Sequence, residues 1–194
     1  LEVGAGDTLT LSGTVSGAGF TKTGAGTLVL SGANTYIGTT TVSAGTLAIT
    51  NATGLGTTAG NTSVASGATL DLKNVTGVAE ALSLSGTLAA SSGTSSLSGN
   101  VTLGANATAN VAGTQLSLGG TVAETGGARG LSKSGAGTLL LSGANTYSGG
   151  TSVSAGVLQA GVSSSGSISN GPFGTGVVTV ASGAAVDLNG QALA

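Results

Sequence analysis

The chain lacks most of the residue types on which enzyme chemistry depends. Its 194 residues include no histidine, cysteine, methionine or tryptophan, and the single proline is Pro172. Without histidine or cysteine the chain cannot build a Ser-His-acid or Cys-His nucleophile, or a zinc site of the usual ligands. The absence of cysteine suits a protein that crosses an outer membrane unfolded, because an early disulfide would lock a loop.

Charge is also scarce. Charged residues make up 5% of the chain, and six acids against four bases give a net charge of −2. A chain with this charge lacks the basic surface that would bind the phosphates of a nucleic acid. No apolar run approaches the roughly 20 residues that a membrane-spanning helix needs. We therefore expect no nucleic-acid partner and no membrane-embedded segment. The chain begins at Leu1 without a signal peptide, so we expect it to be excised from a longer protein.

Small and β-forming residues take the place of charges. Glycine supplies 38 residues, serine and threonine are abundant, and hydrophobic residues make up 39% of the chain. That apolar fraction, together with the low net charge, argues against disorder. A sequence rich in threonine, valine and leucine favours strands over helices.

The sequence contains a long internal repeat. Residues 20–47 and 131–158 are identical at 20 of 28 positions, at an offset of 111. A second pair, VASGATLDL at 64–72 and VASGAAVDL at 180–188, has an offset of 116. Five extra residues therefore lie between the two pairs, and we place them in the stretch 161–171.

A shorter period lies inside the long repeat. Leu9, Leu28 and Leu47 are 19 residues apart, and Leu70 follows after 23. Each Thr-Leu-x-Leu segment is too short to form an independent sheet, but stacked segments about 4.8 Å apart form a continuous parallel sheet. This predicts an all-β fold, a right-handed single-stranded parallel β-helix (a three-sided solenoid) of roughly nine coils of 19–23 residues. We expect one solenoid segment over 1–194, with clear repeat units at 20–50 and 131–160 and less regular coils at 73–130.

Strand alternation predicts which side chains face inward. The expected inward ladder is Leu9, Leu28, Leu47 and Leu70, flanked by Leu11, Leu30, Ile49 and Leu72, and continued by Leu139 with Leu141 and by Val186 with Leu188. A further inward ladder is expected at Val42, Val64, Val153 and Val180. The expected outward ladder is Thr8, Thr27, Thr46, Thr69 and Thr138, beside Thr10, Val29, Ala48, Asp71 and Leu140.

The turns between these strands are built from small residues. Asn34 and Asn145 suit either left-handed backbone or side-chain stacking at a corner. Glycines at 24, 26, 32 and 45 supply positive φ or let the chain turn tightly.

The pattern GAGTLxLSGANTYxGxTxVSAGxL closely resembles the autotransporter-associated β-strand repeat of passenger regions in Gram-negative autotransporters. The resemblance is strong over 20–50 and 131–160, and residues 73–130 depart from the pattern. It implies a right-handed parallel β-helix that is exported through a C-terminal outer-membrane barrel. The barrel of a parent chain would then be a partner, together with neighbouring coils. The resemblance also implies a location outside the cell, on the bacterial surface.

The few acids give little scope for catalysis. They are Glu2, Asp7, Asp71, Glu80, Glu124 and Asp187. Asp71 and Asp187 occupy equivalent places five or six coils apart, about 25 Å, which is too far for a glycosidase pair. We expect each to be a solvated outward carboxylate beside a turn, and Asp71 with Lys73 to form at most a surface pair. Residues 4–9 match part of the calcium-binding nonapeptide of β-solenoids, but the match does not recur along the chain. The sequence thus predicts no catalytic, cofactor-binding or metal-ligating residue, and no cofactor.

Three functions are compatible with these observations. The first is a non-catalytic structural or adhesive passenger segment, a rigid stalk or scaffold that contacts host or bacterial surface ligands or associates with itself. The second is a binding module for ice or a polysaccharide surface through outward Thr/Ser ladders. The third, an enzyme, has no residues in this chain to support it.

Overall fold

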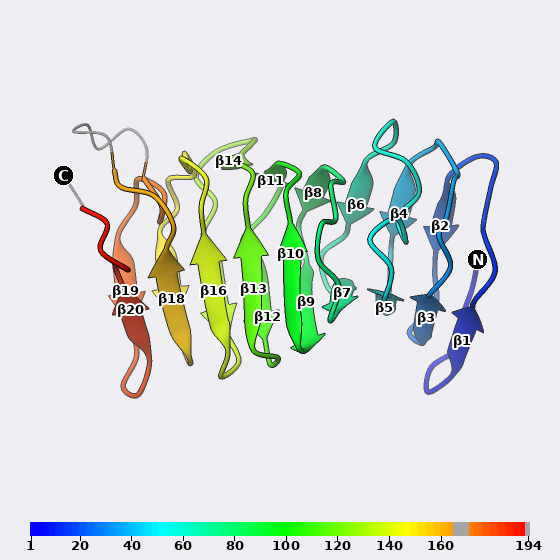
Figure 1. Cartoon of the computed structure of the whole chain (residues 1–194), viewed down its shortest axis with the longest axis horizontal. Coiled ribbons are helices and arrows are strands. Elements are labelled where there is room, and N and C mark those ends of the chain that lie inside the picture. Colours follow the sequence, from blue (N-terminus) through cyan, green and yellow to red (C-terminus); the bar gives the residue numbers. More distant parts are fainter. Residues whose placement is uncertain (165–170, 193–194) are drawn as a thin grey trace.

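The chain folds into a rod of stacked strands. The computed structural model describes residues 1–164 and 171–192, and these residues form twenty strands and no helix. Neighbouring strands within each sheet are parallel in every named pair. The coils advance along the long axis from β1 at one end to β20 at the other (Figure 1). The predicted parallel β-solenoid is confirmed.

Three sheets form the sides of the rod. The nine-stranded sheet contains, in spatial order, β1 (Thr8–Leu11), β3 (Thr27–Leu30), β5 (Thr46–Ile49), β7 (Thr69–Lys73), β9 (Thr87–Ser92), β12 (Ala107–Val111), β15 (Leu131–Ser134), β17 (Thr151–Val153) and β19 (Val178–Val180). The six-stranded sheet contains β2 (Phe20–Lys22), β4 (Thr40–Val42), β6 (Thr62–Val64), β8 (Leu82–Leu84), β11 (Val101–Leu103) and β14 (Val122–Glu124). The five-stranded sheet contains β10 (Thr94–Leu97), β13 (Gln115–Leu118), β16 (Thr138–Leu141), β18 (Val157–Ala160) and β20 (Ala185–Asp187).

Coil length varies along the rod. The first coil joins Thr8 to its partner Thr27, whereas the last coil of the same sheet joins Thr151 to Val178. The coils from Ala107 to Leu131 and from Thr151 to Val178 are longer than the 19–23 residues predicted. The described rod therefore has fewer complete turns than the nine expected.

The core is a set of inward columns. Leu28, Leu47 and Leu70 are fully buried and follow one another in register. Leu9 occupies the same column but is 36% exposed, because β1 is the end strand of its sheet. Burial of one such leucine contributes about 1.5–3 kcal/mol, so the stacked columns dominate the stability of the rod.

The two repeat copies lie on different sides of the rod. In the first copy β3 and β5 belong to the nine-stranded sheet, whereas their counterparts β16 and β18 belong to the five-stranded sheet. The five-stranded sheet begins at β10, in the region without the motif. Because of this extra strand, the two copies are not separated by a whole number of turns of the solenoid. The strands of the second copy therefore lie one side of the rod further round than their counterparts in the first copy.

This rotation corrects several predicted ladders. Leu139 and Leu141 are inward-facing, but they stack on Leu116 and Leu118 and not on the Leu28 column. Val186 stacks on Leu158, and Leu188 lies beyond the end of β20 and is 38% exposed. The expected valine ladder divides into two. Val42 pairs with Val64 in the six-stranded sheet, and Val153 pairs with Val180 in the nine-stranded sheet.

The predicted outward ladder is correct for its first four members. Thr8, Thr27, Thr46 and Thr69 stack in register. Thr138 and Leu140, in contrast, belong to the five-stranded sheet, where they pair with Gln115 and Ser117.

Glycine is required where coils touch through their backbones. Gly24 and Gly45 have φ of 76° and 66°, a region that favours glycine. Gly26 and Gly32 have no such φ. A Cβ added to Gly26 would lie 2.1 Å from the Gly4 carbonyl oxygen, and one added to Gly32 would lie 2.2 Å from the Gly13 carbonyl oxygen. These glycines therefore permit close stacking as well as tight turns.

Candidate functional site

The repeat corner is built from three side chains that recur in both copies: a lysine, an asparagine and a tyrosine. Lys22 ends β2 and Lys133 lies in β15. Both occupy inward positions, because Lys22 pairs with Val42 and Lys133 with Val153. Both lysines are fully buried.

Each lysine ties its own turn to the next coil. Lys22 Nζ donates to the carbonyl oxygens of Thr23 (2.9 Å), Gly24 (2.8 Å) and Ala44 (3.1 Å). The ammonium group has three N–H donors, so these acceptors satisfy all of them. Burial lowers the pKa of Lys22.

Lys133 makes the same three contacts in the second copy. Its Nζ donates to Ser134 (2.9 Å), Gly135 (2.7 Å) and Ala155 (3.0 Å). Burial lowers the pKa of Lys133 to about 8. From the sequence, these lysines were assigned no role, because the basic residues are scattered along the chain. The signal that identifies them is their shared place in FTKTGAG and LSKSGAG.

The asparagine joins three coils. Asn34 Oδ1 accepts from the Val15 backbone N–H (2.8 Å) in the preceding coil, and its Nδ2 donates to the Gly54 carbonyl (2.7 Å) in the following one. Asn145 repeats this with Val122 (2.7 Å) and Pro172 (2.6 Å). Both asparagines are buried. Of the two roles considered for them, side-chain stacking at a corner is correct.

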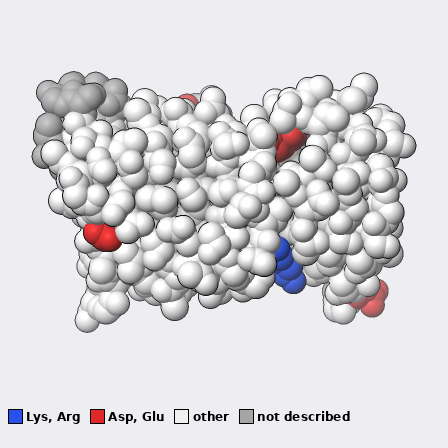
Figure 2. Space-filling model, in the orientation of Figure 1, with Lys and Arg blue, Asp and Glu red and all other residues white. Residues whose placement is uncertain are grey.

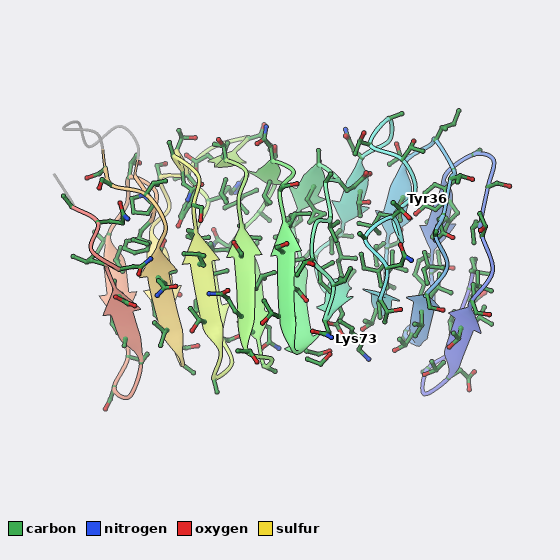
Figure 3. The ribbon with its side chains drawn as sticks, in the orientation of Figure 1. Tyr36 and Lys73 are labelled. Carbon is green, nitrogen blue, oxygen red and sulfur yellow. The ribbon has the colours of Figure 1, made fainter. Side chains whose placement is uncertain are left out.

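The tyrosine fills the corner. Tyr36 is fully buried, and its hydroxyl is 2.7 Å from Thr40 Oγ1. Tyr147 is equally buried, with its hydroxyl 2.6 Å from Thr151 Oγ1. Burial raises the pKa of both phenols to about 12. Figure 3 labels Tyr36 in the part of the rod that carries the first copy.

The corner contacts resume after the inserted residues. Gly56 and Gly174 each lie against the preceding tyrosine, with φ of 84° and 76°. The Pro172 carbonyl accepts from Asn145 as the Gly54 carbonyl accepts from Asn34. The extra residues of the second copy therefore lie before Pro172. Residues 165–170 of the predicted insertion at 161–171 lie outside the described part of the chain.

One buried acid has no counterpart in the second copy. Glu80 is 3% exposed, and burial raises its pKa to about 7. Among the described residues, its Oε1 and the buried Thr62 Oγ1 have no hydrogen-bond partner. Thr62 stacks on Thr40, the partner of Tyr36. The coils that follow the first copy therefore enclose a titratable carboxyl inside the rod.

The other acids lie apart from one another. Asp71 in β7 and Asp187 in β20 belong to different sheets. Asp187 is exposed as predicted, and bonds to Gln159 and to the Asn189 N–H lower its pKa. Asp71 was predicted to be solvated, but it is 6% exposed.

Asp71 is covered because the next coil bulges over it. The register of β7 and β9 shifts between Asp71 and Lys73. The carboxylate accepts from the Ser91 backbone N–H (3.0 Å) and the Ser91 hydroxyl (2.7 Å), not from Lys73. Figure 3 labels Lys73 beside this bulge.

Among residues 1–164 and 171–192, no three His, Cys, Asp or Glu residues form a group that could hold a metal ion. Nor could any helix in the described part of the chain cross a membrane. That the chain has no catalytic, cofactor-binding or metal-ligating residue stays a prediction.

A column of hydroxyls runs along the outer face of the nine-stranded sheet. Nine residues occupy successive paired positions, one on each strand, and none is buried. They are Thr8, Thr27, Thr46, Thr69, Thr87, Thr108, Ser132, Ser152 and Thr179. We call this column the hydroxyl ladder. It stays continuous through the rotation because a different threonine or serine of the repeat takes over the position.

A groove of about 540 Å³ lies at the C-terminal end of the hydroxyl ladder. Ser132, Ser152 and Thr179 line it, beside Asn106 and Ser148. Its other lining residues are Gly130, Leu131, Gly149, Gly150, Thr151, Gly176 and Val177. An added Cβ at Gly149 or Gly176 would lie 2.2 Å from Arg129 C or 2.4 Å from Gly150 N, so these glycines let the coils beside the groove stack closely.

The wall of the groove is held by a short polar network. Glu124 accepts from the Ser148 hydroxyl (2.6 Å) and from the Arg129 backbone N–H. The bond from Ser148 is the main cause that lowers the pKa of Glu124. Asn106 Oδ1 accepts from the Gly130 backbone N–H (2.8 Å).

Comparison with known proteins assigns the repeated corner to a family. Residues 20–49 and 131–160 match the passenger-associated-transport-repeat. These are the two segments that share the lysine, asparagine and tyrosine contacts. Two segments of the chain are thus similar to this family of repeats. The recognition of an autotransporter passenger repeat from the sequence is thereby confirmed.

A curated relative carries the same kind of sequence. Over 81 residues the chain is 46% identical to the adhesin BmaC autotransporter of Brucella suis biovar 1 (strain 1330). The match covers 41% of this chain and 2% of that protein. No solved structure matches the chain. An 81-residue part of the chain is thus similar to a small part of that adhesin.

Proposed function

We propose that this chain is a non-catalytic, rigid adhesive segment of an autotransporter passenger, exposed on the bacterial surface. The observation that carries the proposal is the pair of passenger-associated-transport repeats in one uninterrupted stack of parallel strands. In a solenoid each coil contacts mainly its neighbours, so the rod extends without a globular core. The Brucella suis relative is an adhesin, which supports the adhesive role.

The composition supports export and display. A chain without cysteine forms no disulfide that would hinder passage through an outer-membrane barrel of the parent chain. The face in Figure 2 carries few charged side chains. Such a surface makes weak, repeated polar contacts along its length, and many weak contacts give strong overall attachment.

The test uses bacteria that display the full-length passenger. One strain lacks residues 1–194, and another carries an unrelated parallel β-solenoid of equal length in their place. We expect attachment to host cells or to other bacteria to fall in both strains, while the passenger is still displayed. Full attachment of the replacement strain would reduce this segment to a spacer and contradict the adhesive role.

A further inference from the structure

The hydroxyl ladder is a regular, uncharged surface along one side of the rod. Its nine members are all threonine or serine, one per strand of the nine-stranded sheet. Adjacent strands are about 4.8 Å apart, so the hydroxyls repeat at that spacing. Threonine is stiff at χ1, so the seven threonine hydroxyls lose little freedom when they bind a ligand.

The groove gives the end of this surface a shallow, open hollow. The last three members of the ladder form its floor. Ser152 Oγ donates to Ser132 Oγ at 3.0 Å, so neighbouring hydroxyls are close enough to contact one ligand group together. The Asn106 carbonyl is bonded to Gly130, and the side chain lines the groove.

The groove also has an apolar wall. Val177 is 75% exposed and lines it. A pyranose ring presents hydroxyls at its edge and C–H groups on its faces, so it matches a site with a hydroxyl floor and an aliphatic wall. Binding sites of this kind combine apolar contact with a few fixed polar groups.

The surroundings disfavour ligands of other chemistry. An anionic ligand would need cationic groups, but none of the described residues that line the groove is a lysine or an arginine. Ice would need a flat array of at least two matched columns. The neighbouring column instead mixes Thr10, Val29, Ala48 and Asp71.

We propose that the hydroxyl ladder and its groove bind a neutral, linear polysaccharide whose chain runs along the rod. The proposal rests on the proposed adhesive function and names the chemical class of its ligand. A chain of neutral sugars fits the length, the absence of charge and the one-dimensional repeat of this face. Contacts repeated on successive coils add up, so affinity should grow with the length of the sugar chain.

Two matched tyrosine substitutions test the site. Ser152 is the exposed central residue of β17, and Ser83 is the exposed central residue of β8 on the six-stranded sheet. Ser152→Tyr fills the groove, whereas Ser83→Tyr adds the same side chain to another face. Circular dichroism checks that both variants fold.

The probes are dextran, galactomannan and xyloglucan, with the anionic polymers alginate and heparin as controls, measured by affinity electrophoresis. We expect at least one neutral polymer to retard the wild-type chain. Ser152→Tyr should weaken this binding at least tenfold, and Ser83→Tyr should leave it unchanged. A second variant, Thr27→Val with Thr69→Val, removes two hydroxyls of the ladder at nearly constant shape and should weaken binding to long polymers more than to short oligosaccharides.

Several outcomes would overturn the proposal: no retardation by any neutral polymer, retention only by alginate or heparin, or equal losses in both tyrosine variants. Thermal hysteresis in solution would assign the ladder to ice instead. If Ser152→Tyr leaves bacterial attachment intact while the deletion of 1–194 abolishes it, the adhesive function stands and the polysaccharide assignment fails.

Discussion

The two repeat copies make the same local contacts in different places on the rod. Lys22 and Lys133 each donate to three carbonyls, two in their own turn and one in the next coil. Yet the strand after the lysine joins the nine-stranded sheet in the first copy and the five-stranded sheet in the second. The repeat therefore specifies a corner and its neighbours, and the number of strands per intervening coil determines the side of the rod on which it lies.

Charge in the core should be equally damaging in both copies, despite the rotation. Leu28 and Leu139 are fully buried equivalents on different sheets. Leu28→Asp and Leu139→Asp should each abolish cooperative unfolding, because an unpaired buried charge costs several kcal/mol. Urea titration followed by circular dichroism measures this.

The partially exposed neighbours serve as controls. Thr27→Asp and Thr138→Asp should each change the free energy of unfolding by less than about 1 kcal/mol. A mild effect of Leu139→Asp would show that the rotated copy does not face the core.

Glu80, in the coils that follow the first copy, predicts a pH dependence with no counterpart in the second copy. Burial raises the pKa of Glu80 from its ordinary 4.5 to about 7. A carboxyl with a raised folded-state pKa binds its proton more tightly when folded. Its contribution to stability is therefore full below pH 4.5 and is lost as the pH rises to about 7. The loss should be on the order of 2–3 kcal/mol.

Glu80→Gln should flatten this decline. Chemical unfolding at pH 5 and pH 7.5 measures the difference. Glu124 and Asp187 have lowered pKa values and act in the opposite direction, with stability lost only as the pH falls below their ordinary values. A wild-type chain as stable at pH 7.5 as at pH 5 would contradict the buried charge.

The lysine ties should be worth the same in both copies. Lys22→Met and Lys133→Met keep the aliphatic stem and remove the donor to three carbonyls. Each should lower the free energy of unfolding by about 1–3 kcal/mol. Lys73→Met, on a partially exposed lysine, should have little effect in the same urea titration. If all three variants are alike, the lysines do not hold the corner.

Removal of the tyrosine hydroxyls should give the smallest difference in unfolding free energy between the copies. Thr151 also donates to the Phe173 carbonyl (3.0 Å), so it keeps a partner when Tyr147 loses its hydroxyl. Thr40 has no such second bond among the described contacts. Tyr36→Phe should therefore cost about 1 kcal/mol, and Tyr147→Phe less. Thermal unfolding of the two variants, side by side, distinguishes them. A larger cost for Tyr147→Phe would reverse the comparison.

Local features of the fold were predictable from the sequence, but the rotation was not. Period-2 alternation placed Leu28 and Leu139 inward, and the repeated SGANTY identified Asn34 and Asn145 as corner residues. A three-sided solenoid was predicted for the whole chain, but nothing in the repeat signalled that the third strand begins only at β10, in the region without the motif. The hydroxyl ladder was predicted only through Thr69, because its later members come from other repeat positions.

The buried polar groups escaped prediction for a different reason. Lysine and glutamate are usually exposed, so nothing about Lys22 or Glu80 taken singly predicted burial. Their burial depends on carbonyls and hydroxyls that other coils bring to them. The repetition of the lysine at an offset of 111 was available in the sequence. Glu80 occurs once and left no comparable signal.

The direction of the lysine and asparagine contacts gives the rod a polarity. Lys22 finds two acceptors in its own turn, but its third belongs to the following coil. Asn34 likewise reaches forward to Gly54 and backward to Val15. A folded coil thus exposes unpaired hydrogen-bond donors and strand edges until the next coil pairs with them. The chain can therefore fold coil by coil, and each added coil stabilises the coil before it.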